Sequence, residues 1–171
     1  MFWTSESGAG EYDVPQCAAG TPPEQCIYTT TSTFPVRQSM RKCSSLSDPW
    51  CAANWDESKK VALLRAGTHC HAPACLGTDL YVCPEGADNC DATTGELICS
   101  NTPVYGAGAA PRFDEPGYVA LPPCLWGSTE EGLMPPPTFA LDRMLHMVKR
   151  DNNTDYHYGV MGQWQMRGAW A

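Results

Sequence analysis

Short apolar runs rich in β-branched and aromatic residues recur along the chain, and clusters of Gly, Pro, Asn and Asp separate them. Residues of these types prefer a pleated, half-buried surface, and the spacing of the runs is typical of antiparallel β-structure. The pattern predicts strands over residues 27–36, 61–71, 78–83, 95–99, 118–121 and 161–170. In the last run Trp164 and Met166 alternate with polar residues, so we expect this closing strand to bury one face.

The remaining segments are predicted from shorter signals. Residues 140–150 fit a helix and a strand equally, because both periods are compatible with so short a run, and the neighbouring strands favour a strand. One helical turn is expected near residues 56–60. Residues 84–94 and 100–117 are predicted to be surface loops, because Gly, Pro and acidic residues dominate them.

These elements predict an all-β fold, an antiparallel and jelly-roll-like β-sandwich that is rich in disulfides and carries long surface loops. Residues 61–171 are expected to form the sandwich. Residues 1–60 are expected to form a Cys-rich, irregular N-terminal arm with one strand, packed on the core, and residues 1–26 to be irregular throughout. A length of 171 residues is in the usual range for one domain.

Cysteine usage indicates a cross-linked protein. Leu, Ile, Val and Phe together supply only 25 residues, whereas ten cysteines, six tryptophans and seven tyrosines are present. An even cysteine count without paired C-x-x-C motifs favours a disulfide framework over a zinc ribbon. Expected disulfide loops lie around Cys17 and Cys26, Cys43 and Cys51, Cys70 and Cys75, and Cys83 and Cys90. Disulfides persist in oxidising compartments, so we expect a secreted or cell-surface protein.

Net charge, hydropathy and one sequence motif limit the classes of partner and predict a surface modification. A formal net charge of −8 argues against nucleic acid, because phosphate neutralisation needs clustered Lys and Arg. No segment reaches transmembrane length. The triplet Asn152-Asn153-Thr154 is an N-glycosylation sequon, which predicts an N-linked glycan at Asn152.

The best candidate for chemistry is His69-Cys70-His71, at the end of a predicted strand. Residues i and i+2 of a strand share a face, so the two imidazoles should lie side by side while Cys70 points away. Cys70 is therefore expected to be structural. An H-x-H pair alone is more typical of two histidines that bind no metal.

Residues 66–71 (AGTHCH), followed by residues 157–161 (HYGVM), resemble the C-terminal domain of copper type II, ascorbate-dependent monooxygenases, the family of peptidylglycine alpha-hydroxylating and dopamine beta-monooxygenases. In that family an H-x-H pair and a distant methionine bind the copper ion at which oxygen reacts. The resemblance covers roughly residues 60–170 and implies one copper ion held by His69, His71 and Met161.

The proposed ligands suit copper independently of the resemblance. A thioether is a soft ligand that favours Cu(I), and imidazole binds both oxidation states of copper, whereas zinc rarely takes methionine. Met166 is the reserve ligand, and His157 is a candidate for contact with the ligands rather than the metal. For each methionine the alternative is packing in the core.

The chain also departs from the family. Those enzymes hold a second copper with three histidines of a preceding domain, and only His146 and His157 remain here. If the protein is an enzyme, it is a monooxygenase-type oxidoreductase that needs a second copper domain not present in this chain, from a missing part of the protein or a partner, and its substrate is an unidentified small molecule or peptide. The alternative function is an extracellular structural or adhesive glycoprotein module that self-assembles into matrix or filaments without catalysis.

Overall fold

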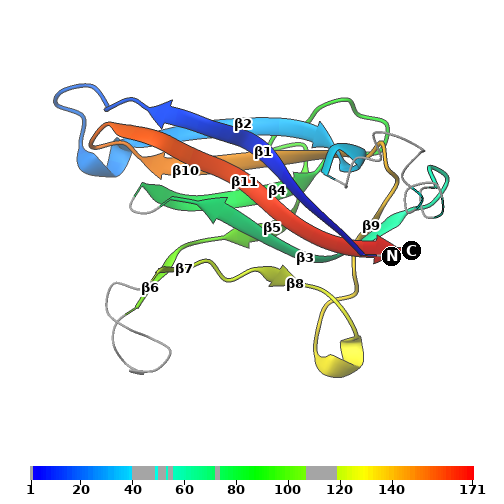
Figure 1. Cartoon of the computed structure of the whole chain (residues 1–171). Helices are drawn as coiled ribbons and strands as arrows, with labels where there is room; N and C mark the ends of the chain where they lie inside the picture. Colours follow the sequence, from blue (N-terminus) through cyan, green and yellow to red (C-terminus); the bar gives the residue numbers. More distant parts are fainter. Residues whose placement is uncertain (1, 40–48, 50–52, 54–55, 72–73, 107–118) are drawn as a thin grey trace.

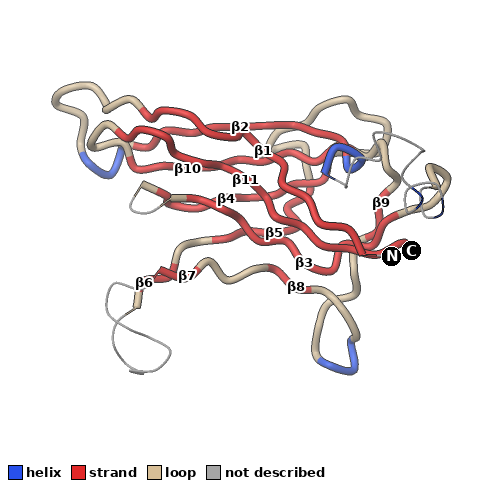
Figure 2. The backbone as a smooth tube through the Cα atoms, viewed as in Figure 1, coloured by secondary structure: helices blue, strands red, loops and turns tan. Residues whose placement is uncertain are grey.

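The protein is an antiparallel β-sandwich, seen here in a computed structural model that describes residues 2–39, 49, 53, 56–71, 74–106 and 119–171. Two sheets lie face to face (Figure 1), and strands make up nearly all the regular structure (Figure 2). The all-β, disulfide-rich sandwich predicted from the sequence is confirmed.

The larger sheet has the strand order β1-β11-β3-β8, and β9 also pairs with β3. Its strands are β1 (Phe2–Val14), β11 (His157–Trp170), β3 (Val61–Cys70), β8 (Cys124–Leu125) and β9 (Thr138–Phe139). The smaller sheet has the order β2-β10-β4-β5. Its strands are β2 (Ile27–Pro35), β10 (Met144–Asn152), β4 (Cys75–Val82) and β5 (Glu96–Asn101). The described residues also include a β6–β7 ribbon (Val104–Tyr105 and Val119–Ala120) and 3₁₀ turns at Pro23–Gln25, Val36–Ser39 and Thr129–Glu131.

The core lies between the two sheets, and β11 contributes to it as the alternation of its residues predicts. Trp164 and Met166 are completely or almost completely buried, while Gln163 and Gln165 between them are only half-buried. Phe34 from β2 and Leu145 and Met147 from β10 belong to the same cluster. Residues 140–150, whose sequence fits a helix and a strand equally, contain a strand from Met144 onward.

The prediction for the first 26 residues was wrong. Phe2–Val14 forms β1, a 13-residue strand that pairs with β11 from Phe2 opposite Ala169 to Val14 opposite His157. The described part of the first 60 residues thus contains two strands, β1 and β2, rather than one. Gly, Ser and acidic residues leave this strand without an alternating apolar pattern. It can still form, because an edge strand is held by backbone hydrogen bonds to its neighbour as well as by apolar side chains.

Residues 56–60 do not form the predicted helical turn. They form a turn in which one Asp56 carboxylate oxygen accepts hydrogen bonds from the Ser58 amide and hydroxyl, at 3.0 and 2.6 Å. An aspartate that binds the backbone two residues ahead favours such a turn over a helix.

Four disulfides cross-link the described part of the chain, and no free cysteine occurs in it. They join Cys17 to Cys26, Cys70 to Cys75, Cys83 to Cys90, and Cys99 to Cys124. The first three confirm the predicted loops, whereas Cys43 and Cys51 lie outside the described residues. The fourth disulfide connects β5 of one sheet to β8 of the other, and this framework is consistent with an oxidising compartment.

Candidate metal centre

The register between β3 and β11 brings the two histidines and Met161 to one face of the larger sheet. Gln163 pairs with His69, and Gly162 pairs with Cys70. Continued by one residue, the same register sets Met161 opposite His71. Directly opposed residues of an antiparallel pair project to the same side, so all three candidate ligands lie on the side away from Trp164 and the core.

The two imidazoles are already close enough to share an ion. Their ring centroids are 5.4 Å apart, and the ring planes are inclined by 77°. With a metal–nitrogen distance of about 2 Å, each centroid lies about 3 Å from the ion, so two rings at the tetrahedral angle have centroids roughly 5 Å apart. His69 is half-buried and His71 is exposed, so the pair is open to solvent and to ligands.

Local cross-links hold this histidine pair in place. The Cys70–Cys75 disulfide closes the connection from β3 to β4, and the His71 carbonyl accepts a hydrogen bond from the Cys75 amide at 3.3 Å. On the core side, the side-chain oxygen (Oδ1) of the buried Asn101 accepts a hydrogen bond from the Thr68 amide at 2.8 Å. The strand is thus fixed on both sides of His69, which reduces the ordering that metal binding would otherwise require.

Met161 is half-buried and belongs to neither hydrophobic cluster of the described residues. Its partner across β1 is Glu11, an exposed carboxylate. The core packing that is the usual fate of methionine therefore does not account for Met161. Its side chain is partly exposed on the same face of the sheet as His69.

The other two candidates do not join this group. Met166 is 1% exposed, packs in the main core cluster and faces the opposite side of the sheet from Met161. His157 begins β11 opposite Val14, four residues before Met161 and so about 13 Å away along the strand. Within the described residues the proposed centre consists of His69, His71 and Met161 alone.

A metal site of the usual hard or borderline type is absent from the described residues. No group of three or more His, Cys, Asp and Glu side chains there could hold a metal ion. A metal at this face would therefore depend on the methionine sulfur. Such a donor set fits copper, and Cu(I) in particular, better than zinc or calcium.

The last remaining histidine, His146, has a structural environment in the smaller sheet. Its Nδ1 is 2.7 Å from the Thr33 hydroxyl, and this hydroxyl donates a hydrogen bond to the Asn89 side chain at 2.8 Å. Burial lowers the pKa of His146, with a smaller opposing effect from the Asp91 carboxylate. Because the Thr33 hydroxyl donates its hydrogen to Asn89, it accepts from His146, so the neutral ring carries its proton on Nδ1.

Sequence reasoning missed a buried charged cluster directly behind the candidate centre. Lys149 and Asp151 are both 0% exposed and form an ion pair. The Lys149 ammonium also donates to the Tyr12 hydroxyl at 2.9 Å, and that hydroxyl donates to Asp151 at 2.8 Å. A Cβ on Gly162, the neighbour of Met161, would lie 2.8 Å from Lys149 Cδ.

Burial sets the proton affinities in this cluster. It raises the pKa of Tyr12, and the hydrogen bond to Asp151 adds to the effect. For Lys149 burial has the opposite effect and lowers the pKa, while the nearby Asp151 opposes that shift. The sequence did contain a signal for this cluster. Lys149 and Asp151 follow Met147 at alternate positions, so on the strand β10 all three side chains share one face.

The sequon residue Asn152 is the last residue of β10 and is half-buried. Its side-chain carbonyl accepts hydrogen bonds from the Thr154 amide and hydroxyl at 2.9 and 2.7 Å. The sequon thus lies in a compact turn at the end of the strand.

Comparison of the chain with protein-family models, curated proteins and solved structures finds no match. Among the described residues, no helix has the length and apolar character needed to cross a membrane.

Proposed function

We propose that this chain is a secreted copper-binding β-sandwich module, related to the oxygen-binding half of copper monooxygenases. His69, His71 and Met161 hold one copper ion, and Asn152 carries an N-linked glycan. The observation that supports the proposal most directly is the β3–β11 register, which pairs Gln163 with His69 and Gly162 with Cys70 and so favours Met161 and the two close imidazoles on one face. When bound, the copper supplies redox chemistry with oxygen.

The protein's own contribution is to hold the ligands and leave the ion accessible. His69 is fixed within β3, and His71 follows at the disulfide-closed end of the strand. Three protein ligands leave room for a further ligand on copper. With His146 bonded to Thr33 and His157 displaced along β11, this chain does not supply a three-histidine second centre, so turnover requires a copper domain outside it.

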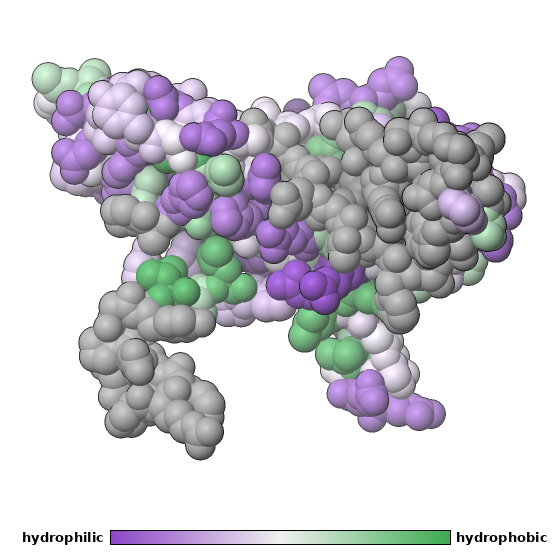
Figure 3. Space-filling model, viewed as in Figure 1, coloured by the Kyte–Doolittle hydropathy of each residue, from purple (hydrophilic) through white to green (hydrophobic). Residues whose placement is uncertain are grey.

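The competing function is an assembly module in which the histidines bind nothing. Its support is the exposed apolar surface around β6, β7 and β8, where Val104, Tyr105 and Leu125 are each more than half exposed. Figure 3 shows apolar side chains gathered near these strands. Patches of this kind often mark protein–protein contacts.

A Cu(I) titration of the full disulfide-bonded chain separates the two functions. We expect one equivalent of copper to bind against a competing chromophoric Cu(I) chelator. The His69→Ala variant should bind at least about tenfold more weakly, a loss of about 1.4 kcal/mol. The matched control is His157→Ala, with unchanged affinity. If the wild-type chain binds no Cu(I), or both variants lose it equally, the metal-binding proposal is wrong.

A further inference from the structure

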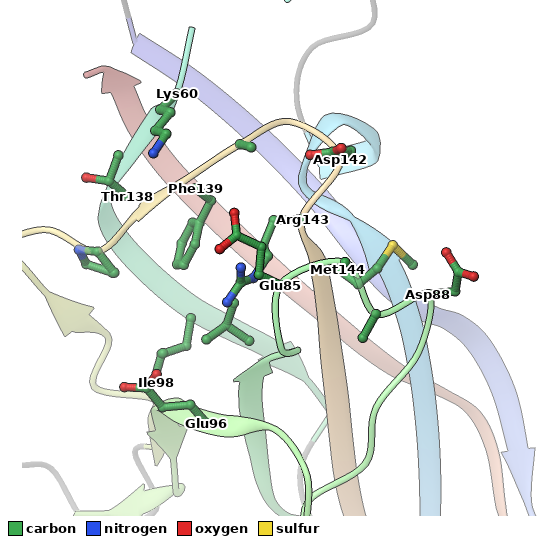
Figure 4. A pocket seen from close by; sticks show the side chains of 15 residues that line it. Lys60, Glu85, Asp88, Glu96, Ile98, Thr138, Phe139, Asp142, Arg143 and Met144 are labelled. Carbon is green, nitrogen blue, oxygen red and sulfur yellow. The ribbon is translucent and has the colours of Figure 1, made fainter. Parts of the chain in front are cut away.

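A cavity of about 680 Å³ lies at the end of the sandwich remote from the histidine pair. It is bounded by the residue before β3, the ends of β4 and β5, and the segment that leads into β10 (Figure 4). Lys60 on its rim precedes His69 by nine residues of extended chain, about 30 Å. Its volume is in the range of small-molecule sites, and it is independent of the proposed copper centre.

The inner wall of the cavity is apolar. Val82 and Phe139 are members of the main core cluster, and the half-buried Ile98 packs against that cluster. Figure 4 shows the Phe139 ring directed into the space between Lys60 and Arg143. An aliphatic group that entered here would exchange water for contact with these three side chains.

The outer wall is charged. Arg143 and Glu85 both line the cavity (Figure 4), and Arg143 forms no ion pair within the described part of the chain. Its Nε is buried without a hydrogen-bond partner. A ligand carboxylate in the cavity would give the guanidinium group of Arg143 an anionic partner.

The carboxylates on the same wall outnumber the cations. Glu85, Asp88, Glu96 and Asp142 face two cations, Lys60 and Arg143. An anion alone would therefore meet net repulsion, and a cation alone would supply no anionic partner for Arg143. A ligand that carries both charges next to an aliphatic group matches all three parts of the cavity.

We propose that this cavity binds a small zwitterion with an apolar side chain, of the size of a free aliphatic amino acid. The ligand carboxylate pairs with Arg143, the ammonium lies beside Glu85, and the side chain contacts Phe139. The pairing gives the Arg143 guanidinium an anionic partner, and because the ligand carries no net charge it does not add to the surplus of acidic residues.

Three probes that share the 3-methylbutyl group test this assignment by isothermal titration calorimetry on the full disulfide-bonded chain. The probes are L-leucine, 3-methylbutylamine, which lacks the carboxylate, and 4-methylpentanoate, which lacks the ammonium. We expect leucine to bind at least about tenfold more tightly than either single-charge analogue. No heat from leucine at about 20 mM, or equal binding of the amine, would overturn the proposal.

Two variants identify the contacts. Arg143→Met keeps an apolar stem and should weaken leucine and 4-methylpentanoate but not the amine, whereas Glu85→Gln, at an exposed position, should weaken leucine and the amine but not the carboxylate. Arg167→Met, at an exposed position on β11 outside the cavity, is the control and should change none of them. Because Glu85→Gln alters only a surface side chain, it keeps the test decisive if Arg143→Met does not fold. Unchanged leucine binding in Glu85→Gln refutes the assignment.

Discussion

The buried pair of Lys149 and Asp151 is the feature whose loss should be felt most, so Asp151→Asn is the most informative change to the scaffold. Asparagine keeps the shape of the side chain but removes the charge that faces a completely buried ammonium. Breaking a buried pair by removing one partner costs about 3–5 kcal/mol. Asparagine can still accept a hydrogen bond from Lys149, so we expect the lower end, about 3 kcal/mol.

Urea unfolding followed by tryptophan fluorescence measures this loss, because the fully buried Trp164 becomes exposed when the sandwich opens. For a chain of this size the same loss lowers Tm by roughly 6–12 °C. Asp142→Asn, an exposed aspartate just before β10, is the matched control and should change the free energy of unfolding by less than about 0.5 kcal/mol.

A double-mutant cycle shows whether the charge is responsible. Combining Asp151→Asn with Lys149→Met removes both charges, and we expect the double variant to be more stable than the sum of the single effects predicts, by about 1–3 kcal/mol. If Asp151→Asn unfolds like the wild type, or if the two effects simply add, the ion pair does not stabilise the fold as argued.

Three further predictions concern other parts of the scaffold. Gly162→Ala should lower the free energy of unfolding by about 1–3 kcal/mol, because its Cβ would lie 2.8 Å from Lys149 Cδ, and a normal urea midpoint would contradict this. Burial lowers the pKa of folded His146 below its ordinary 6.5, so the unfolded chain binds more protons below that pH. Stability should be insensitive to this group above pH 6.5 and fall on acidification, and a His146→Gln variant with the same pH slope would refute the assignment. Replacing Cys99 and Cys124 together by alanine should cost about 2–4 kcal/mol, measured as a shift in thermal unfolding under non-reducing conditions, with no shift as the contrary result.

Parts of the fold could be predicted because their side chains carry a periodic signal. The alternation around Trp164 identified β11 and its buried face, and the β-branched run identified β2. Phe2–Val14 has no such signal, because backbone pairing with β11 defines it. The Cys99–Cys124 bridge escaped prediction for a related reason: a cysteine pattern does not specify which distant residues meet.

The candidate site and its surroundings likewise contain residues that a periodic pattern predicts and residues that it does not. The H-x-H spacing placed His69 and His71 on one face of a strand, and strand parity separated Met161 from Met166. By contrast, the charged cluster of Lys149, Asp151 and Tyr12 depends on contact between two sheets, and the cavity around Arg143 is assembled from distant segments. Tertiary sites of this kind leave little trace in local sequence, because each residue alone resembles an ordinary surface position.

X-ray absorption spectroscopy of the Cu(I)-loaded chain tests the central claim most directly, since it detects sulfur bound to the metal. We expect two imidazoles and one sulfur in the wild type, and loss of the sulfur in Met161→Leu. Met134→Leu, at a methionine that is 70% exposed and remote from the pair in sequence, should retain it. A wild-type spectrum without sulfur, or sulfur that persists in Met161→Leu, would contradict the proposed centre.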